Sequence, residues 1–432
     1  MPTLETLVSL AKRRGFIFQN SEIYGGLGSV WDFGPVGVEL KRRIKDYWWT
    51  SMVQNRNDIE GIDSSILMDP AVWEASGHLK GFSDPLVECV NCHKRFREDE
   101  VDSKCPDCDS GLSDPRQFNL MFKTFMGPVE EDAATIYLRP ETAQGIFVNF
   151  NNVLTTTRRK IPFGIAQIGK SFRNEITPGN FIFRTREFEQ MEMEYFCYPK
   201  DSDKLFKEWI EFSMNWFKEI GIQEKNLRTR IHNDEERPHY AKAATDIEYN
   251  FPWGWGELET INNRTDYDLK NHMEKSGRDL SYFDESTKSR FIPYVIEPAM
   301  GADRTTLAVF SDAYHEEEVN NETRTVLKFD PKISPIEVAV LPLSRNEKLK
   351  SISNKVFNII RSSFRGQFDD TQSIGKRYRR QDEIGTPVCV TIDFDTLDDH
   401  SVTIRNRNTM KQVRIEITKI KEVIKDHLET QF

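Results

Sequence analysis

At 432 residues the chain is longer than one hydrophobic core usually supports, so we expect two or more domains. Its apolar runs fall short of the ~18 residues that a membrane span needs, and no basic segment followed by an apolar one opens the chain, so a cytoplasmic protein without membrane contact is expected. The net charge of −10 excludes a protein that coats nucleic acid with a broad cationic surface, although a local basic patch would fit.

The N-terminal segment is predicted to contain two helices. Residues 6–14 have the spacing of a short amphipathic helix, and a glycine-rich loop follows through residues 25–37. In residues 38–53 the apolar positions Leu40, Ile44 and Trp48 recur at helical spacing, with basic residues on the other side. This second helix is predicted to pack on the core, and a dimer interface is the alternative.

Four of the six cysteines form two CxxC pairs separated by twelve residues. This spacing can place four thiolates around one Zn²⁺ at ~2.3 Å, whereas a metal-free or redox pair is the alternative. Four thiolates leave no open position for water, so a structural zinc ribbon is predicted over residues 85–112, with His93 as a bystander. The predicted ligands are Cys89, Cys92, Cys105 and Cys108.

Residues 161–173 and 186–198 are strand-like runs joined by turn-forming residues at 177–180, which predicts a long antiparallel hairpin. Because side chains alternate along a strand, Met191, Met193 and Tyr195 share an apolar face. The opposite face carries cations, an aromatic ring and acids: Arg184, Arg186, Phe188, Gln190, Glu192 and Glu194. A solvated sheet face is the alternative for this polar set.

Two later segments favour a binding site over a solvated face. Glu257 and Glu259, on a strand predicted over residues 255–261, again present two carboxylates on one face. A strand at 294–297 ends in Glu297, and residues 301–304 open a helix predicted over 302–314, whose N-terminus is suited to an anion. The intervening residues 199–250, with a helix at 204–220, are predicted to be an insertion.

A proline-containing linker is predicted at residues 331–335, and the pattern changes after it. Strands at 336–341, 388–394 and 402–404, with helices at 347–361 and 410–428, predict a separate α/β domain of buried, mostly parallel strands. Within it lies the basic run Lys376, Arg377, Tyr378, Arg379 and Arg380, which suits phosphates and an unstacked base, with a solvated charge run as the alternative.

These motifs resemble the class II aminoacyl-tRNA synthetases. The three signature motifs correspond to the helix ending in residues 48–62, to residues 172–175 with 184–188, and to residues 301–304. The resemblance implies an α+β fold in which an antiparallel sheet is flanked by helices, over residues 1–330 and with the zinc-ribbon insertion. It also implies a homodimer through the first motif, and a C-terminal domain over residues 336–432 similar to the class IIa anticodon-binding domain.

Four segments resemble the glycine-specific members of this class: WDFGPVG at 31–37, RPETAQG at 139–145, REFEQME at 186–192 and NRTDYDL at 263–269. The activity implied is the joining of glycine and ATP as glycyl-adenylate with release of pyrophosphate, followed by transfer of the glycyl group to the 3′ end of tRNA(Gly). Glycine has no side chain, so recognition must rest on its charges and on a pocket too full for anything larger.

By resemblance, Glu141, Glu192 and Glu297 hold the glycine ammonium, and Arg264 lies near its carboxylate or the adenylate. Arg97, beside the zinc ribbon, is a weaker candidate. The full set of expected glycine-binding residues is Arg97, Glu141, Phe188, Glu189, Gln190, Met191, Glu192, Arg264, Glu297, Pro298, Ala299, Met300 and Gly301.

For ATP, the resemblance assigns Arg173 to the α-phosphate, Phe188 to adenine stacking and Arg304 to the γ-phosphate. Arg184 would orient the triphosphate and Glu175 the adenine, and Glu257 would bind Mg²⁺, which takes oxygen ligands. Arg173, Glu175 and Arg304 are the expected catalytic residues. The expected ATP-binding residues are Arg173, Asn174, Glu175, Phe183, Arg184, Thr185, Arg186, Glu187, Phe188, Glu257, Leu258, Gly301, Ala302, Asp303 and Arg304.

Two positions depart from the family pattern. Ala299 stands where members commonly have serine, and Gly179 where some have an arginine. Two alternatives stay open at this point. One is another class IIa synthetase, for threonine, proline or histidine, against which the carboxylates and RPETAQG argue. The other is an inactive homologue such as a DNA polymerase accessory subunit, against which Arg173, Glu175 and Arg304 argue.

Overall fold

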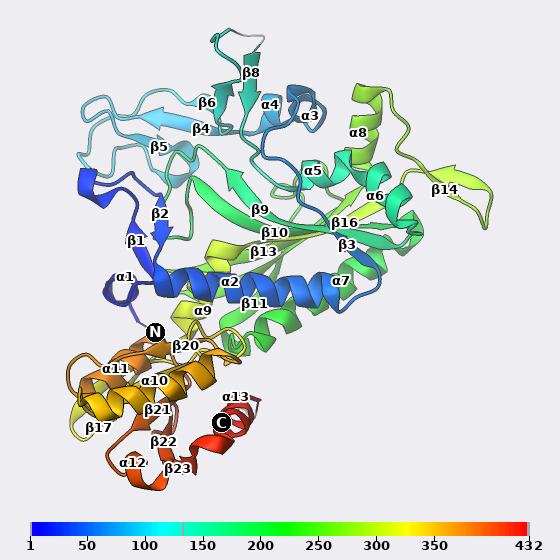
Figure 1. Ribbon diagram of the computed structural model, residues 1–432. Coiled ribbons are helices and arrows are strands. Elements are labelled where there is room, and N and C mark those ends of the chain that lie inside the picture. Colours follow the sequence, from blue (N-terminus) through cyan, green and yellow to red (C-terminus); the bar gives the residue numbers. More distant parts are fainter. Residues whose placement is uncertain (1, 132–133, 430–432) are drawn as a thin grey trace.

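A computed structural model describes residues 2–131 and 134–429. A twisted seven-stranded sheet forms its centre, in the order β11-β12-β13-β16-β10-β9-β3, and only the edge pair β3–β9 of that sheet is parallel (Figure 1). Its strands are β3 (Ile59–Gly61), β9 (Phe163–Phe172), β10 (Glu187–Cys197), β11 (Leu227–Ile231), β12 (Ala243–Phe251), β13 (Gly254–Thr265) and β16 (Tyr294–Gly301). The antiparallel synthetase sheet expected from the sequence is therefore confirmed.

Helices cover both faces of this sheet. On one face the main core packs beneath α1 (Leu4–Arg13), α2 (Pro35–Trp49), α7 (Ser202–Glu219) and α9 (Ala302–Ala313). A second apolar cluster lies on the opposite face with α3 (Pro70–Ala75), α4 (His78–Gly81), α5 (Ala143–Val148), α6 (Phe150–Thr157) and α8 (Tyr267–Ser276) nearby. No helix among the described residues is both long and apolar enough to cross a membrane.

Smaller strands extend the central unit. The cysteine-rich insertion is built on a three-stranded sheet of β4 (Ser83–Glu88), β5 (Arg95–Arg97) and β6 (Arg116–Asn119). The remaining pairs are β1 (Ile17–Gln19) with β2 (Trp31–Phe33), β7 (Lys123–Phe125) with β8 (Thr135–Tyr137), β14 (Tyr282–Asp284) with β15 (Ser289–Phe291), and β17 (Tyr314–Val319) with β18 (Glu322–Leu327).

The predicted hairpin is confirmed, because β9 and β10 pair antiparallel from Phe172–Glu187 to Phe163–Phe196. Met191, Met193 and Tyr195 are buried in the main core, as their alternation indicates. The second helix, in contrast, begins at Pro35 rather than Val38, because proline is well suited to a first helical position after the extended Gly34.

The segment 199–250 is not a separate insertion. It contributes α7, β11 and β12 to the central unit, and Trp209, Trp216 and Ile247 from it are buried in the main core. The sequence prediction was wrong because the amphipathic pattern of α7 does not reveal which surface the helix covers.

The C-terminal domain holds a five-stranded sheet in the order β20-β19-β21-β22-β23. Its first three strands are parallel and its last two pairings antiparallel, so the expectation of mostly parallel strands is only half right. The elements are β19 (Val338–Pro342), α10 (Glu347–Arg361), β20 (Gly366–Phe368), α11 (Ile374–Ile384), β21 (Val388–Ile392), α12 (Thr396–Asp399), β22 (Ser401–Asn406), β23 (Gln412–Glu416) and α13 (Ile420–Glu429).

The helix predicted over residues 410–428 is divided in the structure. Val413 and Ile415 pair with β22 in the edge strand β23, and only α13 is helical. Alternation over five residues is a weaker signal than the longer helical pattern beside it, which explains the error.

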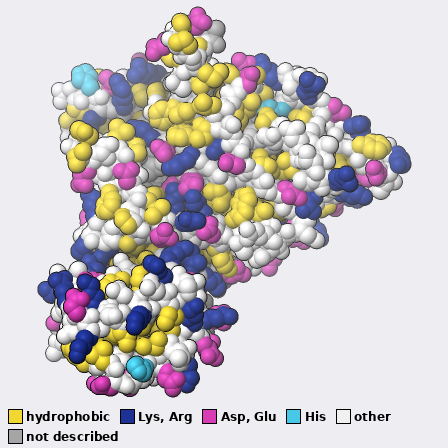
Figure 2. Space-filling view, viewed as in Figure 1, with side chains coloured by type: hydrophobic (Ala, Val, Ile, Leu, Met, Phe, Trp, Pro, Cys, Tyr) yellow, Lys and Arg dark blue, Asp and Glu magenta, His cyan; other side chains and the backbone are white. Residues whose placement is uncertain are grey.

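Charged groups tie the C-terminal domain to the rest of the chain. Arg324 of β18 donates to Asp382 of α11 at 2.8 Å, and Arg407 donates to the carbonyl of Phe329 at 2.8 Å. Arg365 forms a further pair with Glu39 of α2 at 2.9 Å. Ser334, within the predicted linker, is fully buried. Figure 2 shows Lys and Arg side chains gathered where the two units meet.

Candidate active site

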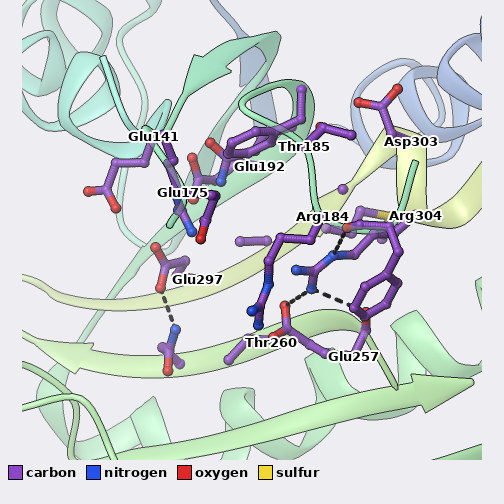
Figure 3. Close-up of a pocket in the computed structure, with 18 of the residues that line it drawn as sticks. Glu141, Glu175, Arg184, Thr185, Glu192, Glu257, Thr260, Glu297, Asp303 and Arg304 are labelled. Carbon is purple, nitrogen blue, oxygen red and sulfur yellow. Dashed lines mark hydrogen bonds and ion pairs between the residues drawn. The ribbon is translucent and has the colours of Figure 1, made fainter. Parts of the chain in front are cut away.

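A cavity of about 260 Å³ opens on the sheet face opposite α2, bounded by β10, β13 and β16 and by the turn between β9 and β10. Figure 3 shows Glu141, Glu192 and Glu297 towards one end of the cavity, and Arg184 and Arg304, with Glu257, at the other. The cavity brings together these residues expected from the sequence: Glu141, Arg173, Glu175, Phe183, Arg184, Thr185, Phe188, Gln190, Glu192, Glu257, Glu297, Ala299, Met300, Gly301, Asp303 and Arg304.

The acidic end is formed by Glu141, Glu192 and Glu297, whose side chains converge on one space (Figure 3). Glu192 accepts the backbone N–H of Thr142 at 3.1 Å and its hydroxyl hydrogen. Glu297 accepts from Asn262 at 2.7 Å, and Glu141 accepts from Gln144 at 2.9 Å. Three carboxyl groups are thus held with fixed orientations around an enclosed space suited to a small cation.

Burial and mutual repulsion change the proton affinities of these acids. Burial, reinforced by the charge of Glu141, raises the pKa of Glu192 to about 7. Burial likewise raises the pKa of Glu297 to about 8, although Arg264 opposes the shift. Burial would also raise the pKa of Glu141, but the charges of His78 and Arg264, together with hydrogen bonds from His78 and Gln144, outweigh it and hold that pKa well below the ordinary range. A bound cation would favour the ionised form of all three.

Arg264 lies behind the acids rather than in the cavity. Its guanidinium donates to both oxygens of Asp268, at 2.7 and 2.8 Å, and to Glu297 at 2.6 Å. The side chain of Arg264 is 3% exposed. Its charge is therefore shared between two acids, and Arg264 acts on the cavity by holding Glu297, without lining the cavity itself.

Arg173 lies beside the acids, since its charge acts on Glu192, whereas Arg184 and Arg304 form the opposite, basic end of the cavity (Figure 3). Arg173 lies between two rings, with its guanidinium carbon 5.2 Å from the centre of Phe188 and 5.3 Å from that of Phe82, and it donates to the carbonyl of Pro140 at 3.0 Å. Arg304 donates to the carbonyl of Phe183 at 2.9 Å and pairs with Glu257 at 2.9 Å. Two preoriented cations beside half-buried aromatic rings are suited to phosphates and a planar base.

Glu257 faces the cavity with a side chain that is 45% exposed. A carboxylate in this position fits Mg²⁺, which usually takes one or two carboxylates together with substrate phosphates. Glu259 was expected to share this face with Glu257. It does not, because a bulge between Glu257 and Glu259 in the pairing of β12 with β13 breaks the alternation of side chains. Glu259 consequently points to α7, where Ser213 donates to it at 3.0 Å.

Arg184 reaches from the β9–β10 turn to the cysteine-rich insertion. Its guanidinium donates to Glu100 at 2.6 Å, and the hydroxyl of Thr177 donates to the same carboxylate. The insertion therefore contacts the turn that closes one side of the cavity.

The four cysteines of the insertion come together as their spacing predicts. Their sulfur atoms all lie within 4.8 Å of one another, with Cys89 and Cys108 at 3.4 Å and Cys92 and Cys105 at 3.6 Å. Tetrahedral bonds of ~2.3 Å would separate the sulfurs by ~3.8 Å, so the donor set fits Zn²⁺. The imidazole of His93 instead contacts Glu88 at 3.3 Å, which is consistent with a bystander.

Several expected site residues do not line the cavity. Glu189 pairs with Lys41 and Lys45, and Arg97 pairs with Asp84 and Asp99. Met191 and Leu258 are in the core, on the other side of the sheet. The remaining members of this group are Asn174, Arg186, Glu187, Pro298 and Ala302, which stand beside lining residues in the chain. A motif match includes every residue of a run, whereas a strand presents every second side chain to one face.

The sequence analysis also missed lining residues. Tyr240 and His232 come from the segment that was taken for an insertion, while Thr260 and Asn262 follow the bulge in β13. Strand alternation downstream of the bulge would have identified the last two, because Thr260 and Asn262 share a face. The sequence gives no signal for His232 or Tyr240.

Comparisons with known proteins give the same architecture. The description "tRNA synthetase class II core domain (G, H, P, S and T)" matches residues 124–313, and "Anticodon binding domain" matches residues 337–427. The fold is similar to a prolyl-tRNA synthetase from Cryptosporidium parvum in complex with halofuginone and AMPPNP, with a TM-score of 0.68 at 14% identity, covering 98% of this chain and 75% of that one.

Closer sequence relatives span almost the whole chain. A glycine–tRNA ligase of Ruminiclostridium cellulolyticum is 54% identical, covering 96% of each chain. That of Caldanaerobacter subterraneus is 52% identical, covering 99% of this chain and 98% of the relative, and that of Streptomyces coelicolor is 52% identical, covering 98% of each.

Proposed function

The chain belongs to the glycine–tRNA ligases within the class II aminoacyl-tRNA synthetases, and from this premise we propose how its residues hold each substrate. The enzyme joins glycine to tRNA(Gly) with ATP, through glycyl-adenylate and release of pyrophosphate. The observation that carries the residue assignment is the presence of three glutamates at one end of a cavity whose other end holds Arg184 and Arg304.

Glycine occupies the acidic end, with its ammonium among Glu141, Glu192 and Glu297. The cation offsets the repulsion among these acids, which is the main interaction a ligand without a side chain can offer. Asn262 and Arg264 hold Glu297 in place. Ala299 lines the cavity without a hydroxyl group, so the affinity for glycine depends on the acids.

ATP occupies the basic end. Phe188 stacks on adenine, Arg173 contacts the α-phosphate, and Arg304 contacts the γ-phosphate after giving up part of its pairing with Glu257. Bound Mg²⁺ would neutralise phosphate charge, with Glu257 as its protein ligand. The movement of Arg184 from Glu100 to the triphosphate would bring a third cation to ATP.

The chemistry requires no general base, because the glycine carboxylate is already an anionic nucleophile. This carboxylate attacks the α-phosphorus, and pyrophosphate leaves. The contribution of the chain is to align the two substrates and to stabilise charge that develops on the phosphoryl oxygens, through Arg173 in particular. The ribose hydroxyl of the terminal adenosine of tRNA then attacks the glycyl carbonyl and releases AMP.

The basic run of the C-terminal domain gives limited support for direct anticodon contact. Arg377 is 2% exposed and donates to the carbonyl of Asp369 at 3.2 Å, and Arg380 pairs with the Asp369 side chain. The hydroxyl of Tyr378 bonds Thr391. These three side chains hold the domain together, which leaves Lys376 and Arg379 as the members for tRNA phosphates.

We further propose a homodimer formed along α2 and zinc in the four-cysteine site. Light scattering at several protein concentrations tests the homodimer. A mass of 50.4 kDa, that of a monomer, at every concentration would contradict it.

Pyrophosphate exchange with ATP and individual amino acids tests the substrate site. Exchange with glycine alone, lost in Glu192→Ala, is the expected result. Exchange that persists in Glu192→Ala with unchanged glycine KM would contradict the ammonium site. Glu211→Ala, an exposed glutamate on α7, is the control.

A further inference from the structure

Glu194 is a buried acid that the proposed glycine site does not use. Its side chain is 0% exposed, and neither carboxyl oxygen has a hydrogen-bond donor among the described residues. An ionised carboxylate in such a position would cost several kcal/mol, so the group requires an explanation.

The sheet register places Glu194 directly opposite Glu297. Glu192 pairs with Ala299 and Tyr195 with Ile296 between β10 and β16, and Glu194 and Glu297 therefore face each other across the same strand pair. One carboxyl oxygen from each of Glu192, Glu194 and Glu297 lies within 4.8 Å of the others. Like charges directly opposite each other in a sheet repel, most strongly where water is absent.

The three acids differ in the hydrogen bonds that they receive. Glu297 receives hydrogen bonds from Arg264 and Asn262, and Glu192 receives two from Thr142. Glu194 receives none, and its neighbour on β9 is Ile165, a member of the apolar cluster with Phe196. Burial, together with the charges of Glu297, Glu192 and Asp268, raises the pKa of Glu194 far above its ordinary value, although Arg264 opposes the shift.

We propose that Glu194 is a positioning residue, which stays protonated and donates its O–H to the carboxylate of Glu297, so that Glu297 is held ionised and aimed at the glycine ammonium. This inference rests on the proposed role of Glu297. With Arg264 and Asn262, Glu194 would complete a set of three donors to Glu297. Its neutrality also keeps one more negative charge out of a site that already holds Glu141, Glu192 and Asp268.

Two substitutions distinguish whether the Glu194 side chain acts as a hydrogen-bond donor, as a negative charge or only by filling space. Glu194→Gln keeps the shape and offers an amide N–H to Glu297, and Glu194→Met keeps similar volume without a donor. We expect the glycine KM of Glu194→Gln to stay within about threefold of wild type and that of Glu194→Met to rise about tenfold to a hundredfold, because a buried partner loses a donor. The KM for ATP should change in neither.

A rise in the glycine KM of Glu194→Gln as large as that in Glu297→Gln would overturn the inference, since it would mean that an ionised Glu194 contacts the ammonium. An unchanged glycine KM in Glu194→Met would also overturn it. Urea unfolding of each variant separates these effects from a failure to fold. The Glu297→Gln control isolates the ammonium site itself, because an unchanged glycine KM there contradicts the proposed role of Glu297 whatever Glu194 does.

Infrared spectroscopy at neutral pD gives a readout that does not depend on activity. The wild-type spectrum minus that of Glu194→Gln should contain the C=O stretch of a protonated carboxyl group. A difference spectrum with only the bands of an ionised carboxylate would overturn the inference.

Discussion

Lys41 on α2 and Asp303 at the start of α9 form a buried ion pair, with Nζ 2.6 Å from Oδ1 and both side chains 8% exposed. The same ammonium lies 3.0 Å from Glu189, and the other oxygen of Asp303 accepts the backbone N–H of Glu189 at 2.9 Å. Lys41 thus joins α2 to Glu189 on β10 and to Asp303, the residue before Arg304.

We expect Lys41→Met to destabilise the protein by about 3–5 kcal/mol, because the substitution leaves the buried carboxylate of Asp303 without its cation and removes one of the two cations that pair with Glu189. Urea unfolding measures this change. The matched control is Arg42→Met, since Arg42 is 68% exposed and its Asp46 partner 63%, and it should unfold like the wild type. Equal stability of the two variants would show that Lys41 is not required to neutralise Asp303 and Glu189.

Lys41→Met should also raise the KM for ATP more than the KM for glycine, because Asp303 adjoins the arginine at the basic end. Pyrophosphate exchange at saturating glycine, with varied ATP, measures the first value. Equal changes in both would place the effect in overall folding rather than in the nucleotide site.

Glu259 should make stability depend on pH. Burial raises its pKa to about 8, against an ordinary value of 4.5, so the folded state holds a proton that the unfolded state loses first. The stabilising contribution is complete below pH 4.5 and is lost as pH rises towards 8. We expect Glu259→Gln to remove this pH dependence. Between pH 5 and 9, the free energy of unfolding of the variant should therefore rise relative to that of wild type by on the order of 4 kcal/mol.

Urea unfolding of wild type and Glu259→Gln across that pH range tests the assignment. The difference between the two proteins is the relevant quantity, because Glu192 and Glu297 also titrate. Glu211→Gln, on the exposed side of α7, should follow the wild type at every pH. A constant difference between Glu259→Gln and wild type would show that Glu259 is not the titrating group.

Arg173→Ala should lower kcat for pyrophosphate exchange by about a hundredfold to a thousandfold, because a fixed cation is lost from the phosphate where charge develops. Lys170→Ala, on the strand β9 that leads to Arg173, is the control. Lys170 pairs with Glu187 at the surface, 43% and 42% exposed, and its loss should leave the rate unchanged. A fall confined to KM for ATP in Arg173→Ala would indicate ground-state binding instead.

Purified protein should contain one zinc per chain, and Cys105→Ser should lose it, because a four-thiolate site depends on every ligand. Elemental analysis measures the metal, and limited proteolysis should then cleave within residues 85–112. Cys389→Ala removes a buried cysteine of the C-terminal domain and should retain the zinc. Zinc-free wild-type protein with an uncleaved insertion would contradict the structural role.

Local patterns in the sequence were sufficient for the hairpin and the cysteine cluster, because each depends on spacing within one segment. The cavity residues Glu141, Glu192 and Glu297 come from three separate segments and were expected only from the family resemblance. Long-range relationships were not visible. Lys41 and Asp303 lie 262 residues apart, and nothing near either residue indicates the other. The burial of Arg377 was missed for the same reason, since a charged run gives no sign that its partner is a backbone carbonyl of another segment.

The bulge at Leu258 illustrates a different limit. Alternation predicts that Glu257 and Glu259 share a face, but one extra residue sends Glu259 to the far side of the sheet. Register is decided by pairing with β12, and no sequence rule applied to β13 alone would locate the extra residue.

The buried contacts among Arg324, Asp382 and Arg407 have a consequence for tRNA. A C-terminal domain on a loose tether could follow an anticodon to wherever it lay. Here the buried contacts hold the C-terminal domain against the central unit, so the distance between the catalytic cavity and the anticodon-binding domain is fixed before tRNA binds. We therefore expect that a tRNA must match this fixed distance for its anticodon and its 3′ end to bind at the same time.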